Sequence, residues 1–96
     1  MVKIYLAKHA KLDLTEIRQY TVDRRGIEQA RKYIRLIYQR ANDLASGRLQ
    51  GKLREDIAPN LKSYHVGRHI IFYTQSENIM KIARILHEQM DFSRHL

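Results

Sequence analysis

The sequence contains no cysteine and no tryptophan, and only one proline and four glycines among its 96 residues. Without cysteine the chain has no disulfide and no thiolate metal site, so we expect a reducing, cytoplasmic setting. No apolar run approaches the roughly 20 residues that a membrane-spanning helix requires, so no membrane partner is expected. The N-terminal stretch MVKIYLAKHA also lacks an apolar segment long enough for a signal peptide.

Acidic residues are scarce as well. The chain has ten Asp and Glu residues and eighteen Lys and Arg residues, which gives a net charge of +8 at pH 7. A field of that sign attracts acidic protein segments and phosphate backbones, and charge alone does not choose between them. The chain length and the absence of a linker or an internal repeat predict a single domain over residues 1–96.

The spacing of apolar residues predicts the first half of the fold. Alternation over residues 2–6 is typical of a half-buried strand. Spacings of three and four then predict one helix from His9 and a second, strongly amphipathic helix over residues 27–46. The short break between them, which ends at Gly26, favours an antiparallel helical hairpin. The apolar stripes of the two helices consist of Ala10, Leu14, Ile17 and Thr21, and of Ile27, Ala30, Ile34, Ile37, Ala41 and Leu44.

The second half of the chain is typical of strands. Residues 47–60 contain the only proline and five charges, so an irregular loop is expected, with Asn60 suited to a left-handed turn. The expected strands cover residues 61–66, 69–74 and 79–87, with turns at Gly67-Arg68 and at residues 75–78. The predicted class is therefore α+β with the order β-α-α-β-β-β. The helical hairpin packs on one face of a small, mainly antiparallel sheet, and the other face is partly open.

Arg84 stands in the middle of the last apolar run, IARILH. Strict alternation would place it on one face with Met80, Ile82 and Leu86, where an unpaired charge is costly. One interpretation is an internal ion pair, and the other is an arginine on the open face that contacts a partner. Because both faces of this strand are apolar, a partner could supply the second cover. The carboxylates available for an internal pair are Asp13, Glu16, Asp56 and Asp91.

Three segments together resemble the ParE branch of the RelE/ParE toxins of bacterial type II toxin–antitoxin systems. They read LDLTEIRQYT, LASGRLQGKLREDIAPNLKSYHVGRHIIFY and IARILHEQMDFSRHL. The resemblance implies the same β-α-α-β-β-β fold, and a cognate ParD-like antitoxin whose flexible C-terminal segment wraps the toxin. For the ParE branch it implies poisoning of DNA gyrase, and for the RelE branch cleavage of messenger RNA on the ribosome. The sequence departs from ParE-like chains at Ala58 and Asn60, where an Arg and a Gly are common.

The residues favour a binding protein over an enzyme. A RelE-type nuclease needs several cations around one phosphate and a group that moves a proton, usually a tyrosine near the C-terminus. No tyrosine follows Tyr73, and His87 is followed by the unfavourable Glu88. We therefore expect no catalytic residue and no cofactor, with nucleic acid reached only through gyrase. The alternatives are a messenger RNA endonuclease built on Lys52, Arg54 and His87, which would contact ribosome-bound RNA directly, and a non-toxic homologue that only binds its antitoxin.

His65 and His69 are four residues apart, but the hairpin signal between them breaks any helix and no third ligand is evident, so no metal site is expected.

The basic helix face is expected to be solvated; it consists of Arg31, Lys32, Arg35 and Arg40. The residues predicted to bind the target are Lys52, Arg54, Arg84, His87, Met90, Arg94 and His95. The residues predicted to bind the antitoxin are Ile17, Tyr20, Tyr38, Tyr64, Phe72 and Met80.

Overall fold

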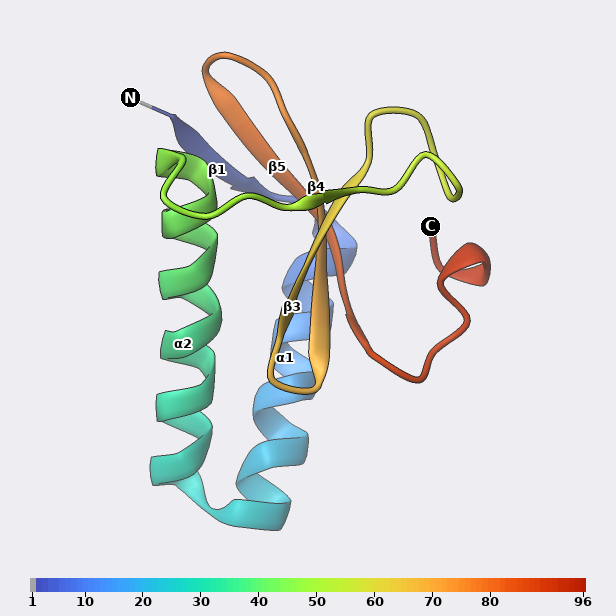
Figure 1. The fold of residues 1–96 in the computed structure, drawn as a ribbon. Helices are drawn as coiled ribbons and strands as arrows, with labels where there is room; N and C mark the ends of the chain where they lie inside the picture. Colours follow the sequence, from blue (N-terminus) through green and yellow to red (C-terminus); the bar gives the residue numbers. More distant parts are fainter. Residues whose placement is uncertain (1) are drawn as a thin grey trace.

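A computed structural model describes residues 2–96 and shows two helices packed on a five-stranded sheet (Figure 1). The helices lie side by side and are joined at one end by a short turn, as the short break between the two helical patterns predicted. The elements are β1 (Lys3–Leu6), α1 (Lys8–Arg25), α2 (Ile27–Ser46), β2 (Lys52–Leu53), β3 (Lys62–Val66), β4 (His69–Gln75), β5 (Ile79–His87) and the 3-10 helix η1 (Phe92–Arg94).

The sheet has the strand order β1-β5-β4-β3-β2. The pairs β2–β3, β3–β4 and β4–β5 are antiparallel, whereas β1 runs parallel to β5. The predicted α+β class and element order are confirmed. The strand predicted over residues 2–6 is β1, but its parallel pairing with β5 and the two-residue strand β2 were not predicted. Neither of these two features follows from local periodicity, because each depends on which distant segment lies alongside.

The turns form where the sequence predicted them. Gly26 separates the helices at φ 87°, a backbone conformation that side chains disfavour, and its N–H donates to the carbonyl of Val22. Asn60 adopts a left-handed φ of 62°, as expected. The β3–β4 hairpin turns at Gly67-Arg68, and its tip points toward the same end of the molecule as the helical turn (Figure 1).

The main core lies between the helical hairpin and the sheet. The predicted stripes are confirmed in their central residues, while Ile27, at the start of α2, is 47% exposed. Ile27 is the first residue of α2, next to the turn between the helices, and it belongs to neither core. The buried residues of this core include Ala10, Leu14 and Ile17 from α1, Ile37, Ala41 and Leu44 from α2, and Ile71, Tyr73, Met80, Ile82 and Ile85 from the sheet.

The face of the sheet away from the helices, here called the second face, carries a smaller core. Leu61, Phe72 and Leu86 are buried there. The loop between β2 and β3 and the C-terminal segment lie over this side (Figure 1). They contribute the partly buried Ile57, Ala58 and Phe92. The chain therefore supplies much of the second cover itself, where the sequence interpretation had left this face to a partner.

Strict alternation along β5 is wrong, because the register between β4 and β5 shifts at Phe72/Tyr73. Tyr73 pairs with Ile82 and Phe72 with Arg84, so one residue of β5 is left over. As a result Ile82 and Ile85 both enter the main core, while Leu86 belongs to the second face. A bulge of this kind turns the apolar pattern over within one strand.

Within residues 2–96, neither helix is long and apolar enough to cross a membrane.

Candidate functional site

Arg84 forms an internal ion pair with Asp13 of α1. Its Nε and Nη2 atoms donate to the two carboxylate oxygens, each at 2.8 Å. The side chains are only 19% and 8% exposed, so the pair is largely shielded from water. These hydrogen bonds raise the pKa of the Arg84 guanidinium further above its already high value. Of the two interpretations of Arg84, the structure shows the internal ion pair and not an arginine left free on an open face.

Asp13 also completes the sheet. Strand β1 pairs with β5 only as far as Ile82, after which the chain turns into α1. On the side where β1 has ended, the backbone N–H of Ile85 has no strand partner, and it donates to Asp13 Oδ2 at 3.0 Å. One carboxylate thus satisfies a buried backbone donor and a guanidinium together.

Arg54 is held in a similar way on the second face. Its guanidinium makes two hydrogen bonds to Asp56, at 3.1 and 3.0 Å, and lies 5.9 Å from the ring centroids of both Phe72 and Phe92. The two rings are 4.9 Å apart. Arg84 Nη1 also donates a 2.9 Å hydrogen bond to the carbonyl of His95. Together these contacts attach the C-terminal segment to the sheet.

The residues predicted to bind the target do not form one cluster. Lys52 lies opposite Ser63, and Ser63 lies opposite Phe72, which places Lys52 and Arg54 on the second face. His87 lies opposite His69 and faces the helices, on the other side of the sheet. The three residues of the nuclease alternative therefore do not converge. Among the predicted target residues, the exposed ones are Lys52, Met90, Arg94 and His95.

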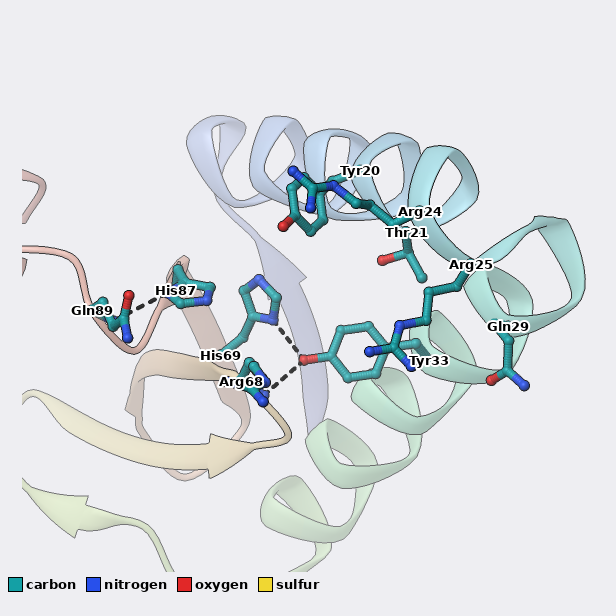
Figure 2. Close-up of a pocket in the computed structure, with 10 residues that line it drawn as sticks. All are labelled: Tyr20, Thr21, Arg24, Arg25, Gln29, Tyr33, Arg68, His69, His87 and Gln89. Atoms are coloured by element: carbon teal, nitrogen blue, oxygen red, sulfur yellow. Dashed lines mark hydrogen bonds between the residues drawn. The ribbon is translucent and has the colours of Figure 1, made fainter.

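His87 belongs instead to a hollow between the helical hairpin and the end of the sheet, here called the histidine pocket (Figure 2). Its volume is about 500 Å³. Both helices, the β3–β4 hairpin and the segment after β5 contribute to its walls. The lining residues are Tyr20, Thr21, Arg24, Arg25, Gln29, Tyr33, Arg68, His69, His87 and Gln89.

Tyr33 and two histidines form the floor of this pocket. Tyr33 Oη lies 2.6 Å from His69 Nδ1 and accepts the backbone N–H of Arg68 at 3.2 Å (Figure 2). The rings of His69 and His87 meet edge to face, with centroids 5.4 Å apart. The close approach of Tyr33 requires Gly67, because a Cβ there would lie 2.7 Å from Tyr33 Cε1.

Burial keeps both members of the Tyr33–His69 pair neutral. It lowers the pKa of His69 from 6.5 to about 4, and the neighbouring His87 adds to this effect. It likewise raises the pKa of the Tyr33 hydroxyl. At neutral pH the site therefore holds a protonated phenol against an uncharged imidazole.

Sequence reasoning missed Tyr33 and His69 as members of a site. In the sequence, Tyr33 is one more residue of the predicted second helix, next to Ile34 of the apolar stripe, and His69 is the first residue of a predicted strand. The two are 36 positions apart, and no local pattern connects them. The residue His87 was singled out, but with the wrong neighbours, because its strand partner was unknown.

The predicted antitoxin-binding residues divide into two groups. Ile17, Phe72 and Met80 are buried in the two cores, at 6%, 0% and 0% exposure, so they support a surface from beneath. Tyr20 and Tyr38 are exposed, and Tyr64 is partly buried under the helices. Tyr38 belongs to a groove between the helices of about 220 Å³, whose lining residues are Leu6, Lys11, Leu14, Thr15, Arg18, Ile34 and Tyr38.

The described part of the chain holds no group of three or more histidine and carboxylate side chains placed to bind a metal ion. In the histidine pocket, His69 Nδ1 is occupied by Tyr33, and His87 Nδ1 accepts the backbone N–H of Gln89 at 3.2 Å.

The sequence places the protein in a family. The model of the ParE toxin of the type II toxin–antitoxin system parDE matches residues 4–92. The chain therefore belongs to the ParE toxin family of type II toxin–antitoxin systems.

Particular relatives support this assignment. The chain is 32% identical to Toxin ParE1 of Mycobacterium tuberculosis over 92 residues, which cover 95% of this chain and 94% of that protein. It is 31% identical to Toxin ParE1 of Caulobacter vibrioides over 91 residues, with the same coverage. The fold resembles a chain of the chromosomal ParDE system from P. aeruginosa with a TM-score of 0.75, at 20% identity over 91% of this chain and 96% of that chain.

Proposed function

We propose that this ParE-type toxin inhibits DNA gyrase by binding it, without catalytic chemistry of its own, and that a ParD-like antitoxin neutralises it. The observation that carries the proposal is the family match over residues 4–92. The separation of Lys52 and Arg54 from His87 by the sheet supports binding over RNA cleavage. The toxin would hold gyrase on cleaved DNA and so stop replication.

The target-binding surface that we propose is formed by the exposed residues Lys52, Met90, Arg94 and His95. Arg54 and Arg84 hold that surface in place, because each is tied to a carboxylate of the chain. In this arrangement the exposed cationic side chains would contact the target on the second face. The contacts of Arg54 and Arg84 keep the C-terminal segment attached to the sheet.

The antitoxin would bind along the helical hairpin. The groove at Tyr38 offers apolar walls with Lys11 and Arg18 at its rim, which suits an acidic amphipathic segment. The net charge of +8 favours an acidic partner in the same way. The similar P. aeruginosa chain comes from a ParDE pair, which supports the pairing here.

The function is tested by a plasmid supercoiling assay beside a cell-free translation assay, both with purified protein. We expect supercoiling to be inhibited, cleaved plasmid to accumulate, and translation to continue. The double substitution Arg94→Glu/His95→Glu should weaken inhibition, while Arg31→Glu/Lys32→Glu on the solvated helix face should not. Inhibition of translation alone would establish the nuclease alternative, and inactivity in both assays would indicate a homologue that only binds its antitoxin.

The antitoxin surface is tested with the protein encoded next to this gene. Tyr38→Glu places a charge in the apolar groove and should weaken the complex at least tenfold in a calorimetric titration. Gln39→Glu makes the same charge change one residue away on the exposed surface of α2 and should leave affinity nearly unchanged. Equal losses in both variants would argue against the groove.

A further inference from the structure

The histidine pocket gathers positive charge and hydrogen-bond donors around an open space. Arg24 and Arg25 reach it from the last turn of α1, and Arg68 from the β3–β4 hairpin (Figure 2). Within the described part of the chain, ten residues line the pocket, and none of the ten is acidic. The nearby Glu88 is already engaged by His65 at 2.7 Å and by Arg68 at 3.9 Å.

The hydrogen bonds on the floor fix the orientation of two further donors. Tyr33 has one proton, and we assign it to the 2.6 Å contact with His69 Nδ1 rather than to the 3.2 Å contact with the carbonyl of Val66. His87 Nδ1 accepts from the backbone of Gln89. A ring whose Nδ1 accepts a hydrogen bond carries its proton on Nε2, and this holds for His69 and His87. Both imidazoles are donors through their remaining nitrogen, which suits an oxyanion and not a metal ion.

The pocket is larger than a simple ion requires. Its volume of about 500 Å³ falls within the range, roughly 300–1,000 Å³, of sites that hold small molecules. Tyr20, which lines the pocket, is 59% exposed, and the Arg24 guanidinium lies 4.7 Å from the centroid of its ring. Aromatic rings and arginine planes of this kind are surfaces on which nucleic-acid bases stack.

We propose that the histidine pocket binds a nucleotide, with its phosphate held by His69, His87 and the neighbouring arginines and its base stacked at Tyr20. The site would accept a free nucleotide or a nucleotide unit of a nucleic-acid strand, which share the phosphate and the base. The proposal is independent of gyrase inhibition and of antitoxin binding.

The experiment follows the imidazole proton resonances of the full chain by NMR during titration with four probes: inorganic phosphate, AMP, adenosine and N-acetylglutamate. Phosphate and AMP should both shift the His69 and His87 signals. AMP should bind about tenfold more tightly than phosphate, because stacking adds to the phosphate contacts. Adenosine and N-acetylglutamate should bind much more weakly. A further titration with a DNA tetranucleotide, with and without a 5′-phosphate, distinguishes the two sources of the ligand.

Matched variants separate a built site from general charge attraction. Arg24→Gln/Arg25→Gln should weaken AMP binding at least tenfold, whereas Arg31→Gln/Lys32→Gln removes the same charge from an exposed helix surface outside the pocket and should have little effect. Tyr20→Ala should lower the affinity for AMP toward that for phosphate. All these positions are exposed, so the variants are expected to fold, and circular dichroism checks this.

Three results would overturn the proposal. Equal losses of AMP affinity in the two double variants would show unspecific charge attraction. Binding of N-acetylglutamate as strong as that of AMP would indicate a site for acidic peptides. Histidine resonances that none of the phosphate-bearing probes moves would show that the pocket takes no such ligand. Gyrase inhibition by the wild-type protein is measured separately and does not depend on any of these results.

Discussion

Asp13 performs two tasks at the residue scale: it neutralises Arg84 and satisfies the backbone N–H of Ile85. In the part of the chain that the structure describes, no buried side-chain nitrogen or oxygen lacks a hydrogen-bond partner. This completeness matters, because an unpaired charge next to an apolar core costs far more than a surface ion pair contributes.

The substitution Asp13→Ala should therefore destabilise the fold by about 3–5 kcal/mol, because it leaves Arg84 without its partner. Urea unfolding followed by circular dichroism measures the change. Asp43→Ala is the control; it breaks a pair with Arg40 at 3.6 Å that is more open to water and should cost less than about 1 kcal/mol. Similar values for the two variants would mean that the Asp13 pair is no stronger than a surface contact.

His69 makes stability depend on pH. Its pKa is lowered to about 4 in the folded chain, so between pH 6.5 and 4 the unfolded state binds more protons and folding weakens as the pH falls. The loss is on the order of 1–2 kcal/mol, after allowance for partial solvation of the ring. His69→Asn, which retains an acceptor for Tyr33, should show a smaller difference in unfolding free energy between pH 7 and pH 4.5. An unchanged difference would assign the effect to other histidines.

At the scale of elements, the β3–β4 hairpin and α2 meet through Gly67 and Tyr33. Gly67 has φ 57°, and its missing side chain lets the phenol reach the backbone of Val66 and Arg68. The turn type and the pocket floor thus depend on the same residue. A turn prediction from Gly67-Arg68 captured the hairpin but not this second use of the glycine.

Gly67→Ala should cost about 2–3 kcal/mol, from backbone strain together with displacement of Tyr33. Gly47→Ala separates the two contributions, because Gly47 has φ 85° and a Cβ there would meet nothing within 4 Å. It should carry only the strain, about 1 kcal/mol. Thermal unfolding compares the variants, and the NMR titration of His69 should move toward its ordinary pKa in Gly67→Ala alone. No such movement would separate the turn from the pocket.

At the scale of the whole molecule, the charge of +8 sets how the protein meets its partners. The helix residues Arg31, Lys32 and Arg35 are exposed, and the ion pair from Arg31 to Glu28 is long at 3.9 Å and open to water. They are therefore suited to long-range attraction and contribute little to stability.

The association rate with an acidic antitoxin should fall about tenfold or more between 50 and 500 mM salt, while the dissociation rate changes little. Stopped-flow kinetics measures both rates. Arg31→Gln/Lys32→Gln/Arg35→Gln should flatten the salt dependence of association. A salt effect confined to dissociation would contradict steering by the net charge.

The sequence by itself determined the two helices, the strands β1, β3, β4 and β5, and their order. Helices and strands follow from apolar spacings within ten or twenty residues, and Gly26, Asn60 and Gly67 mark their ends by what their own backbones tolerate. The charge follows from composition alone. The family resemblance rested on segments that cover most of the chain, and the family match over residues 4–92 confirms it.

Only the tertiary structure decided the rest. It placed β1 parallel to β5, introduced the bulge that turns over the pattern of β5, and joined Asp13 to Arg84 across 71 positions and Tyr33 to His69 across 36. A local pattern records which side of an element is apolar, but not which distant side chain meets it. Partners such as these are selected by packing and by the cost of leaving a buried polar group unpaired, and both arise only when the chain is folded.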